Sequence, residues 1–310
     1  MIIVSIGGNA LIRRGEAGTI EEQFSNADSA CEAIAALSSN GEGIIITHGN
    51  GPVVGNIVIK NETAKNILPP MPLYVCDADS EGEIGFVIQQ ALYNRLHAIH
   101  RIKDVVALVT QTVVDPDDPA FRSPTKPIGP YYTAEEARVL AAQKGWTVVQ
   151  DSLRGFRRIV PSPRPVRIVE ADVIKRMAAS GIIVIAAGGG GVPVVERTDG
   201  TLHGIDAVVD KDLATSLLAT QAGAQIFINL TQIDRVYLDY GTAKEKGCPE
   251  LKVEDARKYL AQGQFAPGSM GPKIEAAIEF LEHGGSEVLI TAPELLSEAL
   301  NGHGGTRIFK

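Results

Sequence analysis

The sequence predicts an α/β fold in which helices cover both faces of a mostly parallel β-sheet. Short, almost wholly apolar runs alternate with stretches in which apolar residues recur every three or four positions. Buried parallel strands and amphipathic helices have these two patterns. The chain also contains 32 glycines among its 310 residues, and many of them directly follow the apolar runs. Because ligands of such sheets bind at the carboxyl ends of the strands, these glycines indicate a binding site.

The expected elements follow one another along the chain. Residues 2–6 are apolar and mostly β-branched, and they end in Gly7-Gly8-Asn9. Residues 20–37 place apolar side chains at helical spacing, and residues 43–47 form the next apolar run. By the same criteria we expect further helices at 82–98, 133–143, 213–221 and 273–283, and further strands at 105–113, 146–150, 182–187, 226–231 and 287–291.

Composition excludes several classes of protein. The hydrophobic content of 45% is too high for a disordered chain, and no apolar run reaches the roughly 18 residues of a membrane span. The net charge of −8 argues against nucleic acid or an anionic membrane as the main partner, although one pocket can still be positive. Cys31, Cys76 and Cys248 are too scattered for a disulfide framework or a metal site. We therefore expect a cytoplasmic protein with no nucleic-acid or membrane partner.

One segment, at about residues 115–165, interrupts the α/β pattern. It contains eight prolines and many basic residues, and one expected helix and one expected strand lie inside it. Its own apolar and aromatic residues are typical of an inserted subdomain and not of a linker. The length of 310 residues then fits one large domain that carries this insertion.

Three glycine-rich loops directly follow predicted strands: GGNA at 7–10, HGNG at 48–51 and GGGG at 188–191. Successive main-chain N–H groups in such a loop can hold an anion, and the positive end of a following helix favours the same anion. The alternative is that each loop is a tight turn in a large sheet. Three loops at one edge of the sheet favour phosphate binding over turns alone.

Two lysines have surroundings that suit a bound anion. Lys273 follows a Gly-Pro pair at an expected helix start, where a positive side chain is unfavourable unless an anion lies there. Lys211 is the middle residue of an Asp-Lys-Asp triplet just before an expected helix, and we expect Asp210 to hold it toward a transferring phosphoryl group. The alternative for each of them is a solvated lysine or a surface ion pair.

A third lysine, Lys126, lies between two prolines that restrict its main chain. The chain has neither the P-loop pattern GxxxxGK[ST] nor a GxGxxG fingerprint after its first strand. The three lysines and the three glycine loops together indicate a phosphoryl-transfer site that is built from lysines. His97 and His100 have a spacing that metal ligands use, but an exposed helix face explains them better because no third ligand is near in sequence.

Several motifs have the order and spelling found in one known family. They extend over essentially the whole chain: GGNAL, ITHGNGPVVGN, DPDDPAF, PTKPIGP, RRIVPSP, GGGGVPV, VDKDLA and FAPGSMGPKIEAAI. In these motifs the sequence resembles the carbamate kinases of the amino acid kinase superfamily. The resemblance implies a three-layer αβα open sandwich with a protruding subdomain, acting as a homodimer. It also implies reversible phosphoryl transfer between ATP and carbamate, giving ADP and carbamoyl phosphate, with Mg²⁺.

The resemblance implies roles for residues at matching positions. An N-terminal lobe of about 1–181 would hold the substrate and include the lid at about 115–165, and a C-terminal lobe of about 182–310 would hold the nucleotide. The residues implied to bind carbamate and the transferred phosphoryl group are Gly7, Gly8, Asn9, Gly49, Asn50 and Gly51. Those implied in catalysis are Lys126, Lys211, Lys273 and Asp210. Those implied to bind ATP or ADP are Gly189, Gly190, Thr231, Val236, Tyr237, Tyr240, Ser269 and Met270. Carbamate is already anionic and needs no general base, and phosphate oxygens and water would hold Mg²⁺ without a protein ligand.

The sequence departs from the family pattern at three places. Where the family reads close to VCGAM[ST]QG, residues 75–83 read VCDADSEGE, which brings four acids near an anionic substrate. Either these acids begin a helix with a Ser-x-x-Glu capping box or vary a dimer interface, or they alter the choice of substrate. Leu153 and Phe156 replace a glycine and a tryptophan of the lid, and Gln232 departs from the pattern near the expected nucleotide site. The alternative functions are therefore a kinase of another small oxyanion and a catalytically silent nucleotide-binding regulator, and the three lysines count against the regulator.

Overall fold

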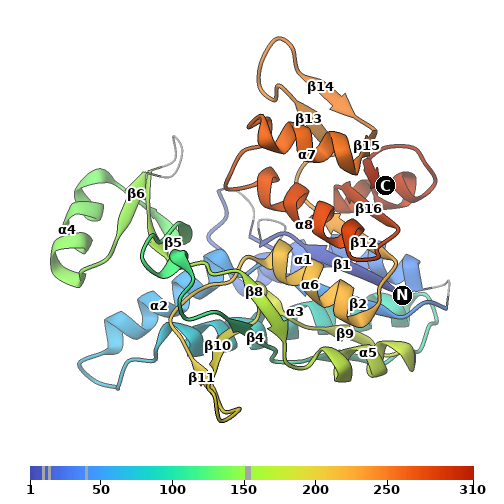
Figure 1. The fold of residues 1–310 in the computed structure, drawn as a ribbon. Coiled ribbons are helices and arrows are strands. Elements are labelled where there is room, and N and C mark those ends of the chain that lie inside the picture. The colour runs from blue at the N-terminus through green and yellow to red at the C-terminus, as the bar shows by residue number, and fades with distance from the viewer. Residues whose placement is uncertain (9–10, 13–14, 39–40, 151–154) are drawn as a thin grey trace.

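The computed structural model describes residues 1–8, 11–12, 15–38, 41–150 and 155–310 (Figure 1). Its main sheet is built from β1 (Ile2–Ile6), β2 (Ile44–His48), β3 (Val105–Ala107), β9 (Ile183–Ile185), β12 (Ile226–Leu230), β15 (Glu250–Lys252), β16 (Glu287–Thr291) and β17 (Thr306–Phe309). The strand order is β15-β17-β16-β12-β1-β2-β9-β3. Neighbouring strands in this order are parallel, except for the antiparallel pair of β16 and β17. The expected mostly parallel sheet is confirmed.

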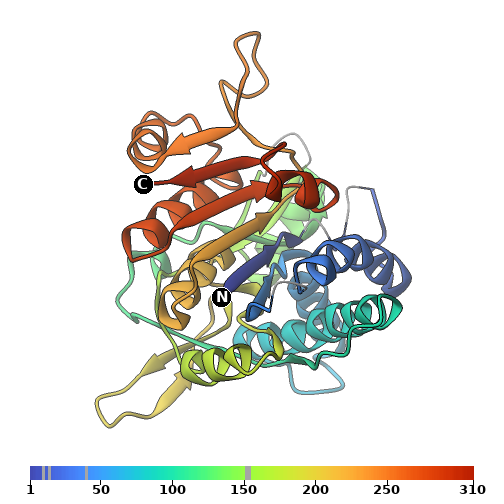
Figure 2. The ribbon, with the colours of Figure 1, turned by 90° about the vertical axis from the view of Figure 1, so that its right-hand side faces the viewer.

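Helices cover both faces of this sheet, as Figure 2 shows. The helices are α1 (Ile20–Leu37), α2 (Gly51–Ala64), α3 (Leu73–Ala98), α4 (Ala134–Lys144), α5 (Ala171–Ala179), α6 (Lys211–Ala222), α7 (Val253–Ala261), α8 (Met270–Glu282) and α9 (Leu296–Leu300). Successive side chains of a strand point to opposite faces, so Val4 packs in one core with α1 and α3, whereas Ile3 packs in another with α5, α6 and α8. The three-layer arrangement that the resemblance implied is therefore present.

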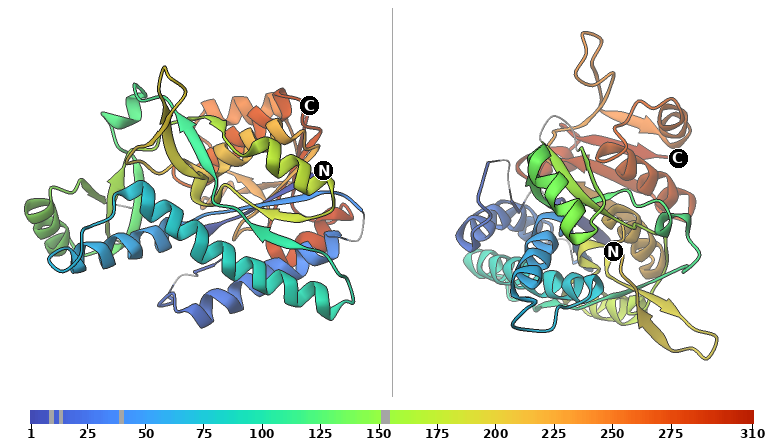
Figure 3. Two further views of the ribbon diagram at one scale, coloured as in Figure 1. Left: turned by 90° about the horizontal axis from the view of Figure 1, so that it is seen from below. Right: turned by 90° about the vertical axis from the view of Figure 1, so that its left-hand side faces the viewer.

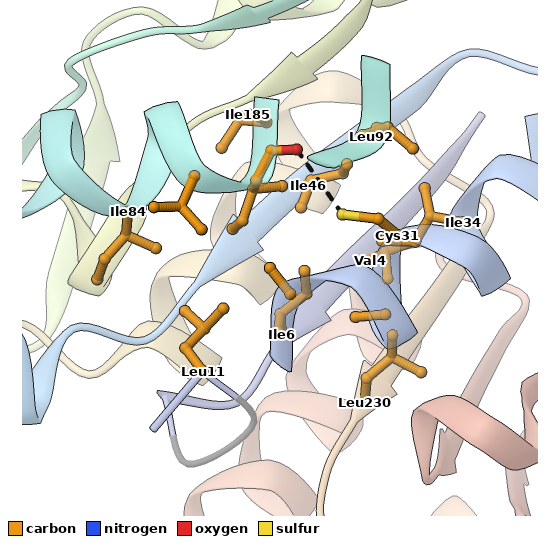
Figure 4. Close-up of a cluster of buried hydrophobic side chains, with 14 of the residues drawn as sticks. Val4, Ile6, Leu11, Cys31, Ile34, Ile46, Ile84, Leu92, Ile185 and Leu230 are labelled. Carbon is orange, nitrogen blue, oxygen red and sulfur yellow. Dashed lines mark hydrogen bonds between the residues drawn. The ribbon is translucent and has the colours of Figure 1, made fainter. Parts of the chain in front are cut away.

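Figure 4 shows the core on the α1 and α3 side, where Cys31 lies beside Val4 and Leu92. The Cys31 thiol donates to the main-chain oxygen of Ile88 at 3.7 Å. Burial raises the pKa of this thiol to about 12. Cys31 is therefore a packing residue, because a buried thiol with a raised pKa is unreactive.

Two helices begin earlier than expected. Helix α3 begins at Leu73, directly after Pro72, and not near residue 82. The acidic residues at 77–83 thus lie inside the helix, and the expected capping box is wrong: the Ser80 hydroxyl donates to the main-chain oxygen of Asp77, three residues earlier. Helix α8 begins at Met270, so Pro272 is its third residue. Proline is accepted there because the first N–H groups of a helix have no partner within it.

The apolar stretch at 105–113 forms two strands in two sheets. Its first part is β3, and its last part belongs to β4 (Gln111–Val114), which pairs with β8 (Pro165–Ile168) and β10 (Val192–Glu196); β10 also pairs with β11 (Leu202–Gly204). Both β9 and β10 come after the expected lobe boundary at residue 181, yet they pair with strands of the N-terminal half. Strand pairing therefore connects the two sides of the expected boundary at residue 181.

The inserted segment forms a small subdomain that protrudes from the sandwich (Figures 1 and 3). It consists of α4 and an antiparallel sheet of β5 (Lys126–Tyr132), β7 (Phe156–Val160) and β6 (Val148–Gln150). From here on, the name lid is used for this unit of α4, β5, β6 and β7 within the segment expected at about 115–165. It rests on α2 where Gly55 faces Gly129: a Cβ atom on Gly55 would lie 1.9 Å from the Gly129 Cα. An ion pair between Lys144 and Glu62 at 3.4 Å joins the same two elements.

The remaining strands, β13 (Val236–Leu238) and β14 (Lys246–Cys248), form an antiparallel hairpin in the C-terminal half. In the part of the chain that the structure describes, no helix is both long and apolar enough to cross a membrane.

Candidate active site

The first two glycine loops meet at the carboxyl ends of β1 and β2. These strands are parallel neighbours, so the loops that follow them lie at the same edge of the sheet. A Cβ atom on Gly49 would lie 2.7 Å from the Gly8 nitrogen and 3.4 Å from the Lys211 Cδ, so only glycine allows this approach. The structure thus brings Gly7, Gly8 and Gly49 beside a predicted catalytic lysine. Asn9 lies outside the described residues.

The third glycine loop, at 188–191, packs beneath the second. Gly189 and Gly190 have φ angles of +66° and +99°, which favour glycine. A Cβ atom on Gly189 would lie 2.1 Å from the Asn50 amide nitrogen, and one on Gly190 would lie 2.5 Å from the Val209 oxygen. Both glycines are buried, and they allow a close approach of Asn50 to Gly189 and of Val209 to Gly190.

A buried cluster of lysine and aspartate lies against these loops. The Lys211 ammonium donates to Asp212 Oδ1 at 2.6 Å and to the Ser5 hydroxyl at 2.8 Å. The Lys273 ammonium donates to the other oxygen of Asp212 at 2.9 Å, and Asn229 donates to Oδ1 at 2.7 Å. Asp212 therefore joins Lys211 and Lys273, which lie 62 positions apart in the sequence. Two ammonium groups and one carboxylate leave this cluster with a net charge of +1.

Asp210 does not hold Lys211 as the sequence analysis expected. Its Oδ1 accepts from the main-chain nitrogens of Asp212 at 2.9 Å and Leu213 at 3.4 Å, so it caps α6. Its Oδ2 pairs with the Lys126 ammonium of the lid at 2.5 Å. Lys211 pairs instead with Asp212, its neighbour on the other side. Which of the two aspartates faces Lys211 depends on how α6 packs in the folded protein.

Burial and charge shift the pKa values of this cluster in opposite directions. Burial, with the repulsion of Lys273, lowers the pKa of Lys211 to about 8. Burial would raise the pKa of Asp212, but Lys211 and Lys273 outweigh burial and hold it well below its usual value. Burial likewise opposes ionisation of Asp210, and Lys126 outweighs it and lowers the Asp210 pKa. The two carboxylates are therefore ionised near neutral pH, and both are engaged by lysines.

The residues expected to bind the nucleotide occupy different surroundings. Tyr237 and Tyr240 contact each other with ring centroids 5.9 Å apart, and the Tyr237 hydroxyl donates to Asp234 at 2.7 Å. Val236 is buried in the core and its nitrogen donates to Thr306, so its side chain is not available to a ligand. Of the three predicted residues in the hairpin region, Tyr237 and Tyr240 are therefore accessible and Val236 serves packing.

Two more members of that group lie at the start of α8. Ser269 is the N-cap residue of α8 but its side chain makes no capping hydrogen bond, and Met270 is the first helical residue. Thr231 follows β12, and its nitrogen donates to the Thr291 oxygen at 2.9 Å. These three residues follow strand ends or begin a helix in the C-terminal half, whereas Gly189 contacts Asn50 of the second glycine loop and Gly190 contacts Val209.

Sequence reasoning missed four residues of the cluster and its surroundings: Asp212, Ser5, Asn229 and Arg157. A signal existed for two of them, because Ser5 and Asn229 are polar residues inside otherwise apolar strands. Arg157 of β7 lies on the lid, and its Nη2 would be 3.9 Å from a Cβ atom on Gly51, the first residue of α2. It adds a fourth positive side chain near the glycine loops.

The described residues offer no preformed metal site. Among them, no group of three or more His, Cys, Asp or Glu side chains has an arrangement that could hold a metal ion. Asp210 and Asp212 are the carboxylates of the cluster, and each already accepts from a lysine. His97 and His100 are exposed, and the His97 ring stacks on Tyr93 at 6.3 Å.

Comparisons with known proteins agree with this geometry. The model of the amino acid kinase family matches residues 1–292. The carbamate kinase of Pyrococcus furiosus is 47% identical over 309 residues, which are 99% of this chain and 98% of that protein. The structure of carbamate kinase from Giardia lamblia bound to citric acid matches with a TM-score of 0.94 at 40% identity, covering 100% of this chain and 98% of that one. The structure of the Giardia lamblia enzyme bound to AMP-PNP matches with a TM-score of 0.90 at 41% identity and the same coverage. This chain belongs to the amino acid kinase family, and its relatives over the full length are carbamate kinases.

Proposed function

We propose that this protein is a carbamate kinase, an ATP-dependent phosphotransferase that reversibly converts ATP and carbamate into ADP and carbamoyl phosphate. The observation that carries the proposal is the buried lysine cluster on Asp212, which lies against the glycine loops of β1 and β2. Full-length relatives of 42–47% identity are named carbamate kinases, which supports the same reaction. A related solved enzyme was bound to AMP-PNP, which supports ATP as the nucleotide.

The mechanism needs charge neutralisation and positioning, and no general base. The carbamate oxygen is already anionic and attacks the γ-phosphorus of ATP, so the bond to the ADP oxygen breaks as the new P–O bond forms. Main-chain N–H groups of the loops at Gly8 and Gly49 would hold carbamate and the transferring group. Lys211 and Lys273 would neutralise the charge on the phosphate oxygens in the transition state, where preorganised charges are most effective. Asp212 keeps both ammonium groups in place beforehand.

The lid would complete the site from the opposite side. Lys126 and Arg157 both belong to it, and Lys126 already reaches the cluster through its pair with Asp210. A phosphoryl group near Asp210 would attract this ammonium away from the carboxylate, because a phosphate dianion is the stronger partner. We infer that the substrate lobe comprises the main-sheet strands up to β9 with the lid, and that the nucleotide lobe begins near α6.

Mg²⁺ enters this proposal only with the nucleotide. The carboxylates of the cluster are occupied by lysines, so the described residues do not by themselves fit a metal ion. In kinase sites, Mg²⁺ is usually bound by oxygens of the substrate phosphates and by water. No step above depends on the metal.

We further propose that the protein acts as a homodimer. Phe86 and Tyr93 lie seven residues apart on α3 and are therefore on one face of that helix. They are 53% and 58% exposed, and Ile20 at the start of α1 is 42% exposed. The Phe86 ring also contacts the ring of Phe24 of α1 edge to face at 5.9 Å, so the two helices share this apolar surface. A second copy of the chain would cover it.

A coupled assay that measures ATP formation from ADP and carbamoyl phosphate tests the function. We expect turnover by the wild type, and a fall of at least about 10²-fold in kcat for Lys211→Ala, because one preorganised charge is lost from the transition state. Lys60→Ala, which removes an exposed lysine of α2, is the matched control and should keep wild-type activity. Absence of turnover in both directions would refute the proposal.

The same assay separates the alternative functions. Turnover with other carboxylates or with phosphonates at the efficiency of carbamate would indicate a kinase of another small oxyanion. ATP binding without phosphoryl transfer would indicate a silent regulator.

A further inference from the structure

The side chain of Asn50 is held by hydrogen bonds to two residues of α3. Asn50 follows Gly49 in the second glycine loop and is buried. Its amide nitrogen donates to the Ser80 hydroxyl at 2.9 Å and to Asp77 Oδ1 at 3.2 Å. Both N–H bonds of the amide are therefore used by two residues of one turn of α3.

Ser80 determines which way the amide faces. The Ser80 hydroxyl donates its only proton to the main-chain oxygen of Asp77 at 2.7 Å. The Ser80 oxygen can therefore only accept from Asn50, so the NH₂ group and not the carbonyl oxygen of the amide faces α3. This conclusion does not depend on whether Asp77 is ionised.

In the part of the chain that the structure describes, the carbonyl oxygen of the Asn50 amide has no hydrogen-bond donor. Asn50 is the N-cap residue of α2, where an asparagine oxygen normally accepts from a main-chain nitrogen of the first turn, but its side chain makes no capping hydrogen bond. Among the described residues none donates to Asn50 Oδ1. Although Asn50 is a buried residue, its Oδ1 is not among the fully enclosed side-chain atoms without a partner, so this oxygen is open to a small polar partner such as a water or a ligand.

We propose that Asp77 and Ser80 lock the Asn50 amide so that its Oδ1 accepts a hydrogen bond from the amino group of carbamate or carbamoyl phosphate. The proposal rests on the proposed function. An acceptor oxygen repels the oxyanions of the substrate and attracts its N–H bonds, so it would place the amino end at Asn50 and the oxygen ends at the lysines. Asp77 and Ser80 are then positioning residues. Through Asn50 they favour a phosphoryl acceptor that has an N–H group next to its carboxylate.

This proposal assigns a role to the inner half of the acidic segment. Asp77 and Glu81 are buried, whereas Asp79 is exposed and Glu83 accepts from Gln23 on the other side. Asp77 stands where the carbamate kinase pattern has glycine, so this chain holds the amide with one hydrogen bond more than that pattern provides. Burial raises the pKa of Asp77 well above its usual value, so a neutral Asp77 does not repel the substrate anion.

The test compares two phosphoryl donors that differ only at the recognised group. Carbamoyl phosphate and acetyl phosphate each transfer their phosphoryl group to ADP, giving ATP with carbamate or acetate, and acetyl phosphate has a methyl group in place of NH₂. The measured quantity is the ratio of kcat/KM for carbamoyl phosphate to kcat/KM for acetyl phosphate. A site built around a substrate N–H rejects the analogue that lacks it, so the wild type should strongly prefer carbamoyl phosphate.

Removing the lock should lower this ratio. We expect a fall of about tenfold for the double variant Asp77→Ala, Ser80→Ala and about threefold for each single variant, because each removes one hydrogen bond of ordinary strength. Most of the fall should be in kcat/KM for carbamoyl phosphate. Asp77→Asn keeps an acceptor oxygen and should restore the ratio, which a role of charge alone would not do. Asp79→Ala changes an exposed acid of the same helical turn and is the matched control.

Each outcome decides the proposal. An unchanged ratio in folded variants, an equal fall for both donors, or a wild type that does not discriminate between them would overturn it. Should the double variant fail to fold, by circular dichroism, Ser80→Ala alone carries the test, because alanine is well tolerated within a helix. A wild type that is inactive with carbamoyl phosphate would refute the proposed function instead, and this result is distinct from all the others.

Discussion

Asp212 is the residue on which the charge of the candidate site depends. Two lysines that approach each other in a buried place repel, and burial of either alone is costly. Asp212 offsets both costs, since each of its oxygens accepts from one ammonium. It neutralises only one of the two positive charges, so the site retains attraction for an anion. The arrangement explains how a protein with a net charge of −8 can bind phosphate groups.

We predict that activity is lost at alkaline pH through Lys211. Its pKa of about 8 means that the free enzyme loses this positive charge as the pH rises above 8. The quantity to measure is kcat/KM for carbamoyl phosphate between about pH 6 and pH 10, which should fall with an apparent pKa near 8 because kcat/KM reports the free enzyme. The fall in kcat should occur at higher pH, since a bound phosphate stabilises the ammonium.

The control for this profile is Lys211→Arg, because a guanidinium stays charged throughout the range. Any activity that this variant retains should lack the alkaline limb, and a wild-type kcat/KM that is constant up to pH 10 would contradict the assignment. The same shift affects stability with a defined sign. Between about 8 and 10.5 the unfolded chain binds the lysine proton and the folded chain does not, so this lysine makes the free energy of unfolding rise with pH there.

At the level of elements, the sequence predicted strands better than helix starts. The strands β1, β2, β12 and β16 were predicted to within a residue or so, because each is a short apolar run that ends in polar or glycine residues. The start of α3 was placed nine residues too late, since the acids at 77–83 resemble a helix start. They lie inside the helix, where Asp77 and Glu81, four residues apart, are buried. Nothing in the local pattern distinguishes such buried acids from solvated ones.

The candidate site was predicted in part for a related reason. Glycines and lysines at strand ends and helix starts are visible in the sequence, and the structure brings Gly8, Gly49, Lys211 and Lys273 together. The partner of Lys211 was not visible, because residues 210 and 212 flank it equally. Only the tertiary structure, in which Asn229 of β12 and Lys273 of α8 donate to Asp212, shows that Asp212 points inward.

The contact between α2 and the lid yields a prediction about Gly55. A Cβ atom at this position would lie 1.9 Å from the Gly129 Cα, a main-chain atom that can move only if the lid moves. Gly55→Ala should therefore displace β5 and Lys126 and lower kcat/KM by at least about tenfold, since small misplacements of catalytic groups are costly. The coupled assay measures this effect.

The matched control is Gly82→Ala on α3. Gly82 is exposed and helical, and a Cβ atom there would have no neighbour within 4 Å. This substitution should leave activity unchanged and raise the free energy of unfolding by about 0.4–1 kcal/mol, measured by urea titration, because alanine restricts the unfolded chain. Wild-type activity in Gly55→Ala would show that the lid adapts without affecting the site.

At the level of the whole molecule, the two faces of the sandwich differ in what covers them. On the α5, α6 and α8 side, β8 of the second sheet contacts α6, and Arg164 pairs with Glu275 and Glu279 of α8. On the α1 and α3 side, Phe86 and Tyr93 of α3 are instead exposed to solvent. Exposed apolar patches of this kind usually mark an interface between proteins. We therefore propose that a second copy of the chain binds on the α1 and α3 side.

We predict that this protein is a dimer and that charge on the α1 and α3 face dissociates it. Sedimentation velocity over a range of concentrations should give a wild-type species of about twice the 32.9 kDa of one chain. Phe86→Lys with Tyr93→Lys should give a monomer, since two desolvated ammonium groups without partners would be buried at the interface. Val166→Lys is the matched control, because Val166 of β8 is 56% exposed on another face and its substitution should leave the dimer intact. A wild type that is monomeric at every concentration would exclude the dimer. A double variant that stays dimeric would place the interface elsewhere. The active site lies at the strand ends and not on this face, so a monomeric variant that keeps its activity would show that each chain carries a complete site.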